Sequence, residues 1–74
     1  MELEHKITLL ALLKKDADEG IDEVLKMLVN TGSFTKKEGK AIIKELRSQG
    51  LVDEVGLTFV GTAKAKEAEA EFKL

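Results

Sequence analysis

The sequence contains no cysteine, proline, tryptophan or tyrosine. Without cysteine there is no disulfide framework and no thiolate metal site, which fits a reducing compartment. The absence of proline excludes proline-rich recognition, and the absence of tryptophan and tyrosine excludes most base-stacking platforms. The longest apolar run, residues 7–13, is too short to span a bilayer, and the features of a signal peptide are absent. We therefore expect a cytoplasmic protein with no membrane association.

Length and charge further restrict the number of domains and the partners that the chain can have. The chain has 74 residues, enough for one small domain over residues 1–74. A chain of this size buries only about 60% of its unfolded surface, so a partner chain would help to stabilise it. The net charge of −2 argues against general nucleic-acid binding, but the charge is uneven. Residues 34–50 carry five cations and two anions, a net of +3, which leaves −5 for the rest.

The stretch 35–47 separates three kinds of side chain onto three faces of one predicted helix. At about 100° per residue, an apolar arc lies beside a basic arc, and the two glutamates lie away from the cations. The apolar arc consists of Gly39, Ile42, Ile43 and Leu46. The basic arc consists of Lys36, Lys37, Lys40, Lys44 and Arg47. This basic arc is either a solvated lysine face or a binding surface for an anionic partner.

Both ends of this helix carry recognisable signals. Thr35 followed by Glu38 three residues later predicts a capping box. Gly50 suits a left-handed cap after the last turn. Because glycine inside a helix costs about 1 kcal/mol relative to alanine, Gly39 on the apolar arc suggests that another helix backbone passes close by.

Residues 3–15 form a second predicted helix with an unusually broad apolar surface. Its inward stripe is expected to contain Leu3, Ile7, Leu10 and Ala11. Further leucines extend the apolar surface around the helix. Two explanations are open: the C-terminal helix of the same chain covers this surface, or a second subunit covers it in a symmetric homodimer. The residues expected at such a dimer interface are Leu9, Leu12, Leu13 and Phe72.

The remaining elements complete a mainly helical pattern. Residues 21–30 predict a helix, and the turn that follows leads through Phe34, a possible hydrophobic staple, into the basic helix. Two helices joined in this way form a helix-turn-helix candidate. Runs 51–55 and 57–60 around a glycine predict a β-hairpin, and 62–72 predict a last helix. The expected fold is mainly α with a small β-hairpin (α+β), in the order helix, helix, helix, hairpin, helix.

Two short sequence motifs, referred to below as phrases, make the chain similar to a known protein family. Gly-Leu-Val at 50–52 follows the basic helix, and Leu-Thr-Phe-Val-Gly-Thr-Ala-Lys-Ala stands at 57–65. With these phrases the chain resembles the winged helix-turn-helix family, in particular small bacterial and archaeal regulators. The resemblance implies that 35–47 is the recognition helix, which lies in the major groove of DNA in DNA-binding members. The implied DNA-binding residues are Thr35, Lys36, Lys37, Lys40, Lys44 and Arg47.

We expect the contacts of such a helix to be mainly with phosphates, because lysine is a flexible point charge and only one arginine is present to read guanine. The predicted wing contains Asp53 and Glu54 and no cation, so we do not expect it to touch DNA. The function expected from the resemblance is double-stranded DNA binding by a small transcriptional regulator or chromosome-associated factor. The alternative is a winged-helix protein-interaction module whose basic face docks onto an acidic protein.

Nothing in the sequence points to an enzyme. His5 is the only histidine, and between Glu4 and Lys6 we expect it at the surface. The serines have no histidine partner at a suitable spacing, and no glycine-rich phosphate loop is present. We predict no catalytic residue, no metal site and no cofactor.

Overall fold

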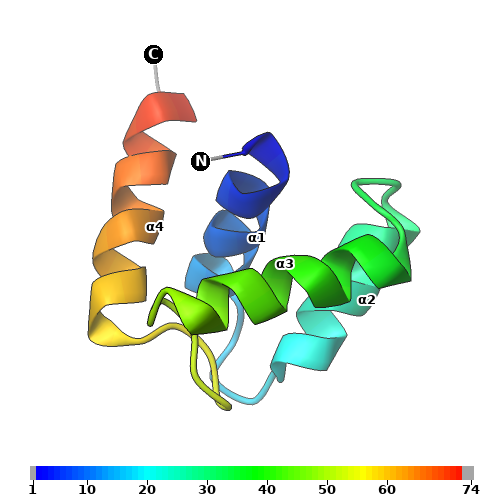
Figure 1. The fold of residues 1–74 in the computed structure, drawn as a ribbon, viewed down its shortest axis with the longest axis horizontal. Coiled ribbons are helices and arrows are strands. Elements are labelled where there is room, and N and C mark those ends of the chain that lie inside the picture. The colour runs from blue at the N-terminus through cyan, green and yellow to red at the C-terminus, as the bar shows by residue number, and fades with distance from the viewer. Residues whose placement is uncertain (1, 73–74) are drawn as a thin grey trace.

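The computed structural model describes residues 2–72, which form four helices and the segments that join them. The helices are α1 Leu3–Lys14, α2 Ile21–Asn30, α3 Lys36–Ser48 and α4 Phe59–Phe72. Helix α1 is the central element, since it packs against each of the other three, whereas α4 packs against α1 alone among the helices. Figure 1 shows α4 running antiparallel beside α1, with α2 and α3 together on the other side. None of these helices is long and apolar enough to cross a membrane.

The central position of α1 changes which of its faces is buried. Leu3, expected to point inward, is 56% exposed, while Leu9 and Leu12 are buried in the core. Thr8, directly before Leu9 in the sequence, is also fully buried, and its hydroxyl donates to the carbonyl of Glu4 at 2.7 Å. That bond satisfies the hydroxyl inside its own helix, so a polar residue can face the core. The most deeply buried face of α1 is therefore not the expected inward stripe, although Ile7 and Ala11 of that stripe are partly buried against the core.

Helix α3 begins as its sequence signals predict. The hydroxyl oxygen of Thr35 accepts from the backbone N–H of Glu38 at 3.2 Å, and the carboxylate of Glu38 accepts from the N–H of Thr35 at 2.9 Å. Both halves of the capping box are present. The chain leaves the helix through Gly50 at φ +74°, a left-handed conformation that glycine adopts without steric cost.

Gly39 is close to side chains rather than to a helix backbone. A β-carbon at this position would lie 2.8 Å from the ring of Phe34 and 3.3 Å from Leu25. Phe34 is buried just before the Thr35 cap, so its ring packs over the first turn as a hydrophobic staple does. The expectation that a second helix backbone approaches Gly39 is corrected: the small residue makes room for the staple.

The predicted β-hairpin is absent from the described residues, which contain only one isolated antiparallel bridge, between Val52 and Leu57. Between them the chain makes a tight turn, in which the carboxylate of Asp53 accepts from the N–H groups of Val55 at 2.8 Å and Gly56 at 2.9 Å. Leu51 and Val52 are both buried, so the run does not alternate as a strand would. The protein is an all-helical domain, not an α+β winged helix.

The end of the predicted hairpin belongs to α4 instead. The hydroxyl oxygen of Thr58 accepts from the N–H of Gly61 at 3.0 Å, so Thr58 caps the helix three residues earlier than expected. Phe59 and Val60, which were assigned to a strand, form its first turn. In this position Phe59 points away from the body of the protein and is 92% exposed.

Candidate nucleic-acid interface

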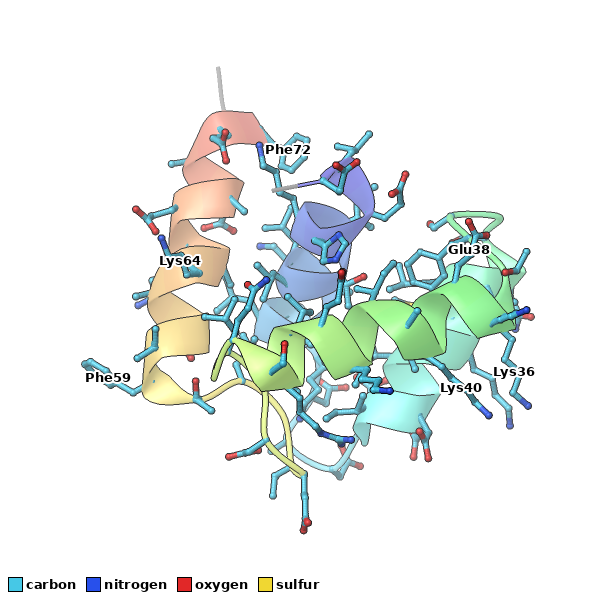
Figure 2. The ribbon with its side chains drawn as sticks, in the orientation of Figure 1. Lys36, Glu38, Lys40, Phe59, Lys64 and Phe72 are labelled. Carbon is cyan, nitrogen blue, oxygen red and sulfur yellow. The ribbon has the colours of Figure 1, made fainter. Side chains whose placement is uncertain are left out.

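Helices α2 and α3 follow one another through a short connection, as the sequence predicts. Their connection passes through Gly32 at φ +80°, and the N–H groups of Thr31 and Ser33 bond back to carbonyls of α2. The apolar arc of α3 is buried, which turns the opposite face outward. This buried arc consists of Gly39, Ile42, Ile43 and Leu46. Figure 2 shows Lys36 and Lys40 projecting from α3 on the side where α2 lies.

All six residues predicted to bind DNA are exposed. The set is Thr35, Lys36, Lys37, Lys40, Lys44 and Arg47. The hydroxyl of Thr35 already takes part in the capping box, so Thr35 stabilises the start of α3. The five cations of the set, which we call the basic face, share one side of the helix. The structure thus brings together the side chains that the helical periodicity grouped.

No ion pair within residues 2–72 involves a cation of the basic face. Three lysines elsewhere are paired: Lys6 with Glu71 at 2.9 Å, Lys14 with Glu69 at 2.8 Å and Lys64 with Glu67 at 3.5 Å. The acidic groups on and around α4 therefore lie beside cations of α1 and α4. The positive charge of α3 is left available for an external anion.

Arg47, at the C-terminal end of the basic face, interacts with an acidic residue of the turn that follows α3. The pKa of Asp53 lies below its usual value, chiefly because the N–H groups of Gly56 and Val55 hydrogen-bond to the carboxylate. The positive charge of Arg47 contributes to the same lowering, which indicates that Arg47 faces the acidic turn. The negative charge of Asp53 offsets part of the positive electrostatic potential around Arg47.

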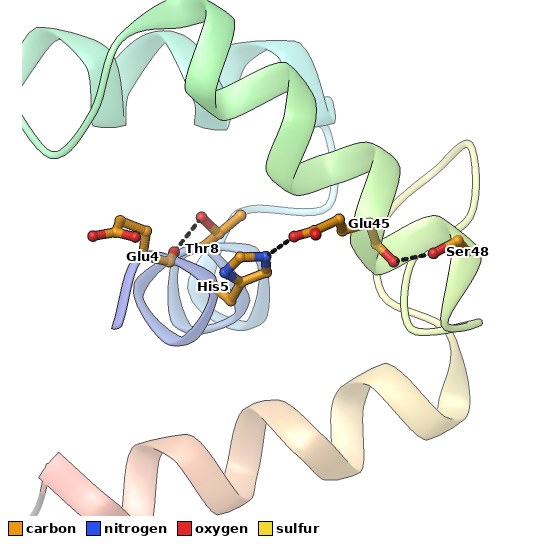
Figure 3. A network of polar contacts seen from close by, with 5 residues as sticks. All are labelled: Glu4, His5, Thr8, Glu45 and Ser48. Atoms are coloured by element: carbon orange, nitrogen blue, oxygen red, sulfur yellow. Dashed lines mark hydrogen bonds and ion pairs between the residues drawn. The ribbon is translucent and has the colours of Figure 1, made fainter. Parts of the chain in front are cut away.

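The two glutamates of α3 are held away from the basic face. Glu38 belongs to the capping box, and hydrogen bonds from the backbone and then the side chain of Thr35 lower its pKa. Glu45 accepts a hydrogen bond from Nε2 of His5, which ties α3 to α1 (Figure 3). The side chain of His5 is only 13% exposed, and its Nδ1 is buried without a hydrogen-bond partner among the described residues. The expectation that His5 lies at the surface was wrong.

A groove between α2 and α3 adds a cation that the sequence analysis did not select. We call it the α2–α3 groove; its lining residues are Asp22, Leu25, Lys26, Val29, Asn30, Lys36 and Lys40. Lys26 is exposed and has no ion pair within the described chain. Its place on the outer side of α2 follows from periodicity, but its proximity to Lys36 and Lys40 depends on how the two helices pack.

The four residues predicted for a dimer interface differ in how deeply the structure buries them. Leu9 and Leu12 are buried within the same chain, as one of the two explanations for the apolar surface of α1 required. Leu13 is partly buried against the core, and Phe72 is 49% exposed. Only Phe72 among the four offers a second subunit a large apolar surface. Homodimerisation stays a prediction.

The described residues contain no group of three or more histidine, cysteine or acidic side chains placed to hold a metal ion. Comparisons with protein-family models, curated proteins and solved structures find no match to this chain. The resemblance to the helix-turn-helix regulators accordingly stays a prediction.

Proposed function

We propose that this protein binds double-stranded DNA through the basic face of α3, as a small transcriptional regulator or chromosome-associated factor. The observation that supports the proposal is the group of five exposed cations on α3, the second of two helices joined by a short turn, none of them in an ion pair within residues 2–72. DNA presents one negative charge per about 1.7 Å of duplex axis, so such a face has a matching partner.

The dimensions of α3 suit this role. Its 13 residues extend for about 20 Å, and a helix of ordinary diameter enters the major groove, which is about 12 Å wide. Lys36, Lys37 and Lys40 would meet phosphates near the start of the helix, and Lys44 would meet them further along. Since lysine rarely reads bases with two hydrogen bonds, binding is governed by the DNA backbone, with modest sequence selectivity.

The test is fluorescence anisotropy with a labelled duplex of about 30 base pairs, titrated at low and moderate salt. If three to five cations of the basic face displace counterions, log Kd changes linearly with log salt with a slope magnitude of about 3 to 4.5. Micromolar binding with such a slope would support the proposal. No binding even at low salt would refute it and favour the protein-interaction alternative.

Two charge-reversal variants distinguish an effect of the basic face on DNA binding from an effect of the protein's net charge. Lys40→Glu and Lys66→Glu change the net charge equally, and both positions are exposed without an ion pair in the described chain. We expect Lys40→Glu to weaken DNA binding by about tenfold or more and to lower the salt slope by about 1 or more. Lys66→Glu, on α4, should have a much smaller effect. Equal losses would show that only net charge matters.

A further inference from the structure

We infer that the α2–α3 groove is a docking site for an acidic amphipathic helix of a partner protein. The groove combines two features: apolar side chains of α2 and cations from both helices. The inference goes beyond DNA binding and does not depend on it. It concerns a second surface that shares only Lys36 and Lys40 with the basic face.

The floor of the groove is formed by Leu25 and Val29. They lie four residues apart on α2, so their side chains follow one another along the same face about 6 Å apart. Both are partly buried and pack against the core from its outer edge. Each therefore keeps apolar surface facing the groove, which an apolar side chain of a partner could cover.

The rim of the groove is positively charged. Lys26 comes from α2, and Lys36 and Lys40 lie four residues apart on α3. All three are exposed and free of ion pairs in the part of the chain that the structure describes. The complementary partner is a helix with an apolar stripe edged by glutamate or aspartate.

The ends of the groove limit the length and orientation of this partner. Asp22 and Asn30 are the first and last lining residues of α2, and eight residue steps of a helix extend about 12 Å. About two turns of a partner helix can therefore lie in the groove. Its acidic side chains should face Lys26, Lys36 and Lys40, and none should lie against Asp22, because two carboxylates repel each other.

An acidic helix fits this groove better than DNA does. The phosphate backbone has no apolar group to cover Leu25 and Val29, and Asp22 would repel it. Lys37 and Lys44 belong to the basic face but do not line the groove. Because Lys36 and Lys40 belong to both surfaces, a docked acidic helix would occupy two of the cations that DNA uses. Binding of the two partners is then mutually exclusive.

The experiment uses a synthetic, fluorescein-labelled peptide of about 14 residues, with leucines at positions i and i+4 and glutamates on either side. Binding to the full chain is followed by anisotropy, and the bound surface by amide chemical shifts. We expect shift changes concentrated in residues 22–30 and 36–40. Replacing the peptide leucines by serine should weaken binding by about tenfold or more, since the apolar contact is lost.

Matched variants of the protein complete the test. Lys26→Glu should weaken peptide binding by about fivefold or more, while Lys66→Glu, an equal charge change on α4, should leave it nearly unchanged. Val29→Ser should weaken it, while Val60→Ser, at a 54% exposed position of α4, should not. Unlabelled DNA should displace the peptide if the proposed function is also correct.

Two results would overturn the inference: equal binding of the leucine and serine peptides, or equal effects of Lys26→Glu and Lys66→Glu. Either would show general charge attraction instead of a groove that takes an apolar stripe. Peptide binding that meets these tests in a protein that fails to bind duplex DNA would support the groove and refute the DNA proposal alone. The two proposals can therefore fail separately.

Discussion

Gly61, in the first turn of α4, lies directly against the backbone carbonyl of Leu51. A β-carbon at position 61 would stand 1.7 Å from the oxygen of Leu51 and 2.7 Å from its carbonyl carbon. That carbonyl cannot easily turn aside, because it accepts a hydrogen bond from the N–H of Thr58 at 3.0 Å. The contact brings the start of α4 onto the segment that follows α3, at a distance that only glycine permits.

We predict that Gly61→Ala lowers the free energy of unfolding by about 3 kcal/mol or more, since the new methyl group meets backbone atoms that have little room to move. Urea unfolding followed by circular dichroism measures this change. Gly20→Ala is the control, because nothing lies within 4 Å of a β-carbon there, and it should cost no more than about 1 kcal/mol. Similar losses in both variants would contradict the close approach.

The capping box of α3 should make a measurable contribution to stability. Thr35→Ala removes the hydroxyl oxygen that accepts from the N–H of Glu38, and losses of about 1 kcal/mol are typical for such a change. Thr35→Ser keeps the oxygen and should cost much less. Urea unfolding of the two variants beside the wild type gives the comparison. If the serine variant is as unstable as the alanine variant, the cap is not the cause.

Acidification should weaken the same cap through Glu38. Its pKa is lowered in the folded protein by hydrogen bonds from Thr35, backbone first, so its carboxylate stabilises the fold above its usual pKa. This contribution is lost as the pH falls from about 4.3 through the lower folded value. Glu38→Gln keeps an acceptor but does not titrate.

We therefore expect the difference in melting temperature between wild type and Glu38→Gln to be largest near pH 7 and to shrink as the pH falls below about 4.3 and the glutamate becomes protonated. Thermal unfolding at several pH values measures the difference. Asp53, whose pKa is also lowered, loses stabilising interactions over acidic pH in both proteins, so its effect cancels. A difference that stays constant across this range would contradict the role of the Glu38 carboxylate.

The homodimer prediction now rests chiefly on Phe72, because Leu9 and Leu12 are buried within one chain. If the protein dimerises through the ends of α1 and α4, Phe72→Ser should shift it toward monomer in sedimentation equilibrium at micromolar concentration. Phe59→Ser is the control: Phe59 is 92% exposed at the opposite end of α4, and its loss should leave the association state unchanged. A monomeric wild type would rule out the dimer at that concentration.

Signals that act within a few residues along the chain could be read from the sequence. The bounds of α2, the capping box at Thr35, the staple at Phe34 and the left-handed cap at Gly50 are all confirmed. Each depends on hydrogen bonds or contacts between residues no more than about five positions apart. The same periodicity placed the apolar arc of α3 inward and its cations outward.

The local signals around residues 51–60 are compatible with two different structures, and the structure has the one that the β-prone runs do not predict. Two β-prone runs beside Gly56 predicted a hairpin, but Asp53 closes the turn with its own side chain and Thr58 starts α4. A strand pair this short has too few ladder hydrogen bonds to compete with a capped helix. Asp53 and Thr58 could have indicated this outcome, since both residue types favour turns and helix starts.

By itself, the sequence determined where helices α2 and α3 begin and end and which side of α3 carries its cations, because those features follow from local hydrogen bonding and helical periodicity. Only the tertiary structure decided which face of α1 is buried, since three helices compete to cover it. Packing also drew His5 and Glu45 together and set Lys26 beside Lys36. Such relationships join residues far apart in the chain, and no local pattern encodes the crossing of two helices.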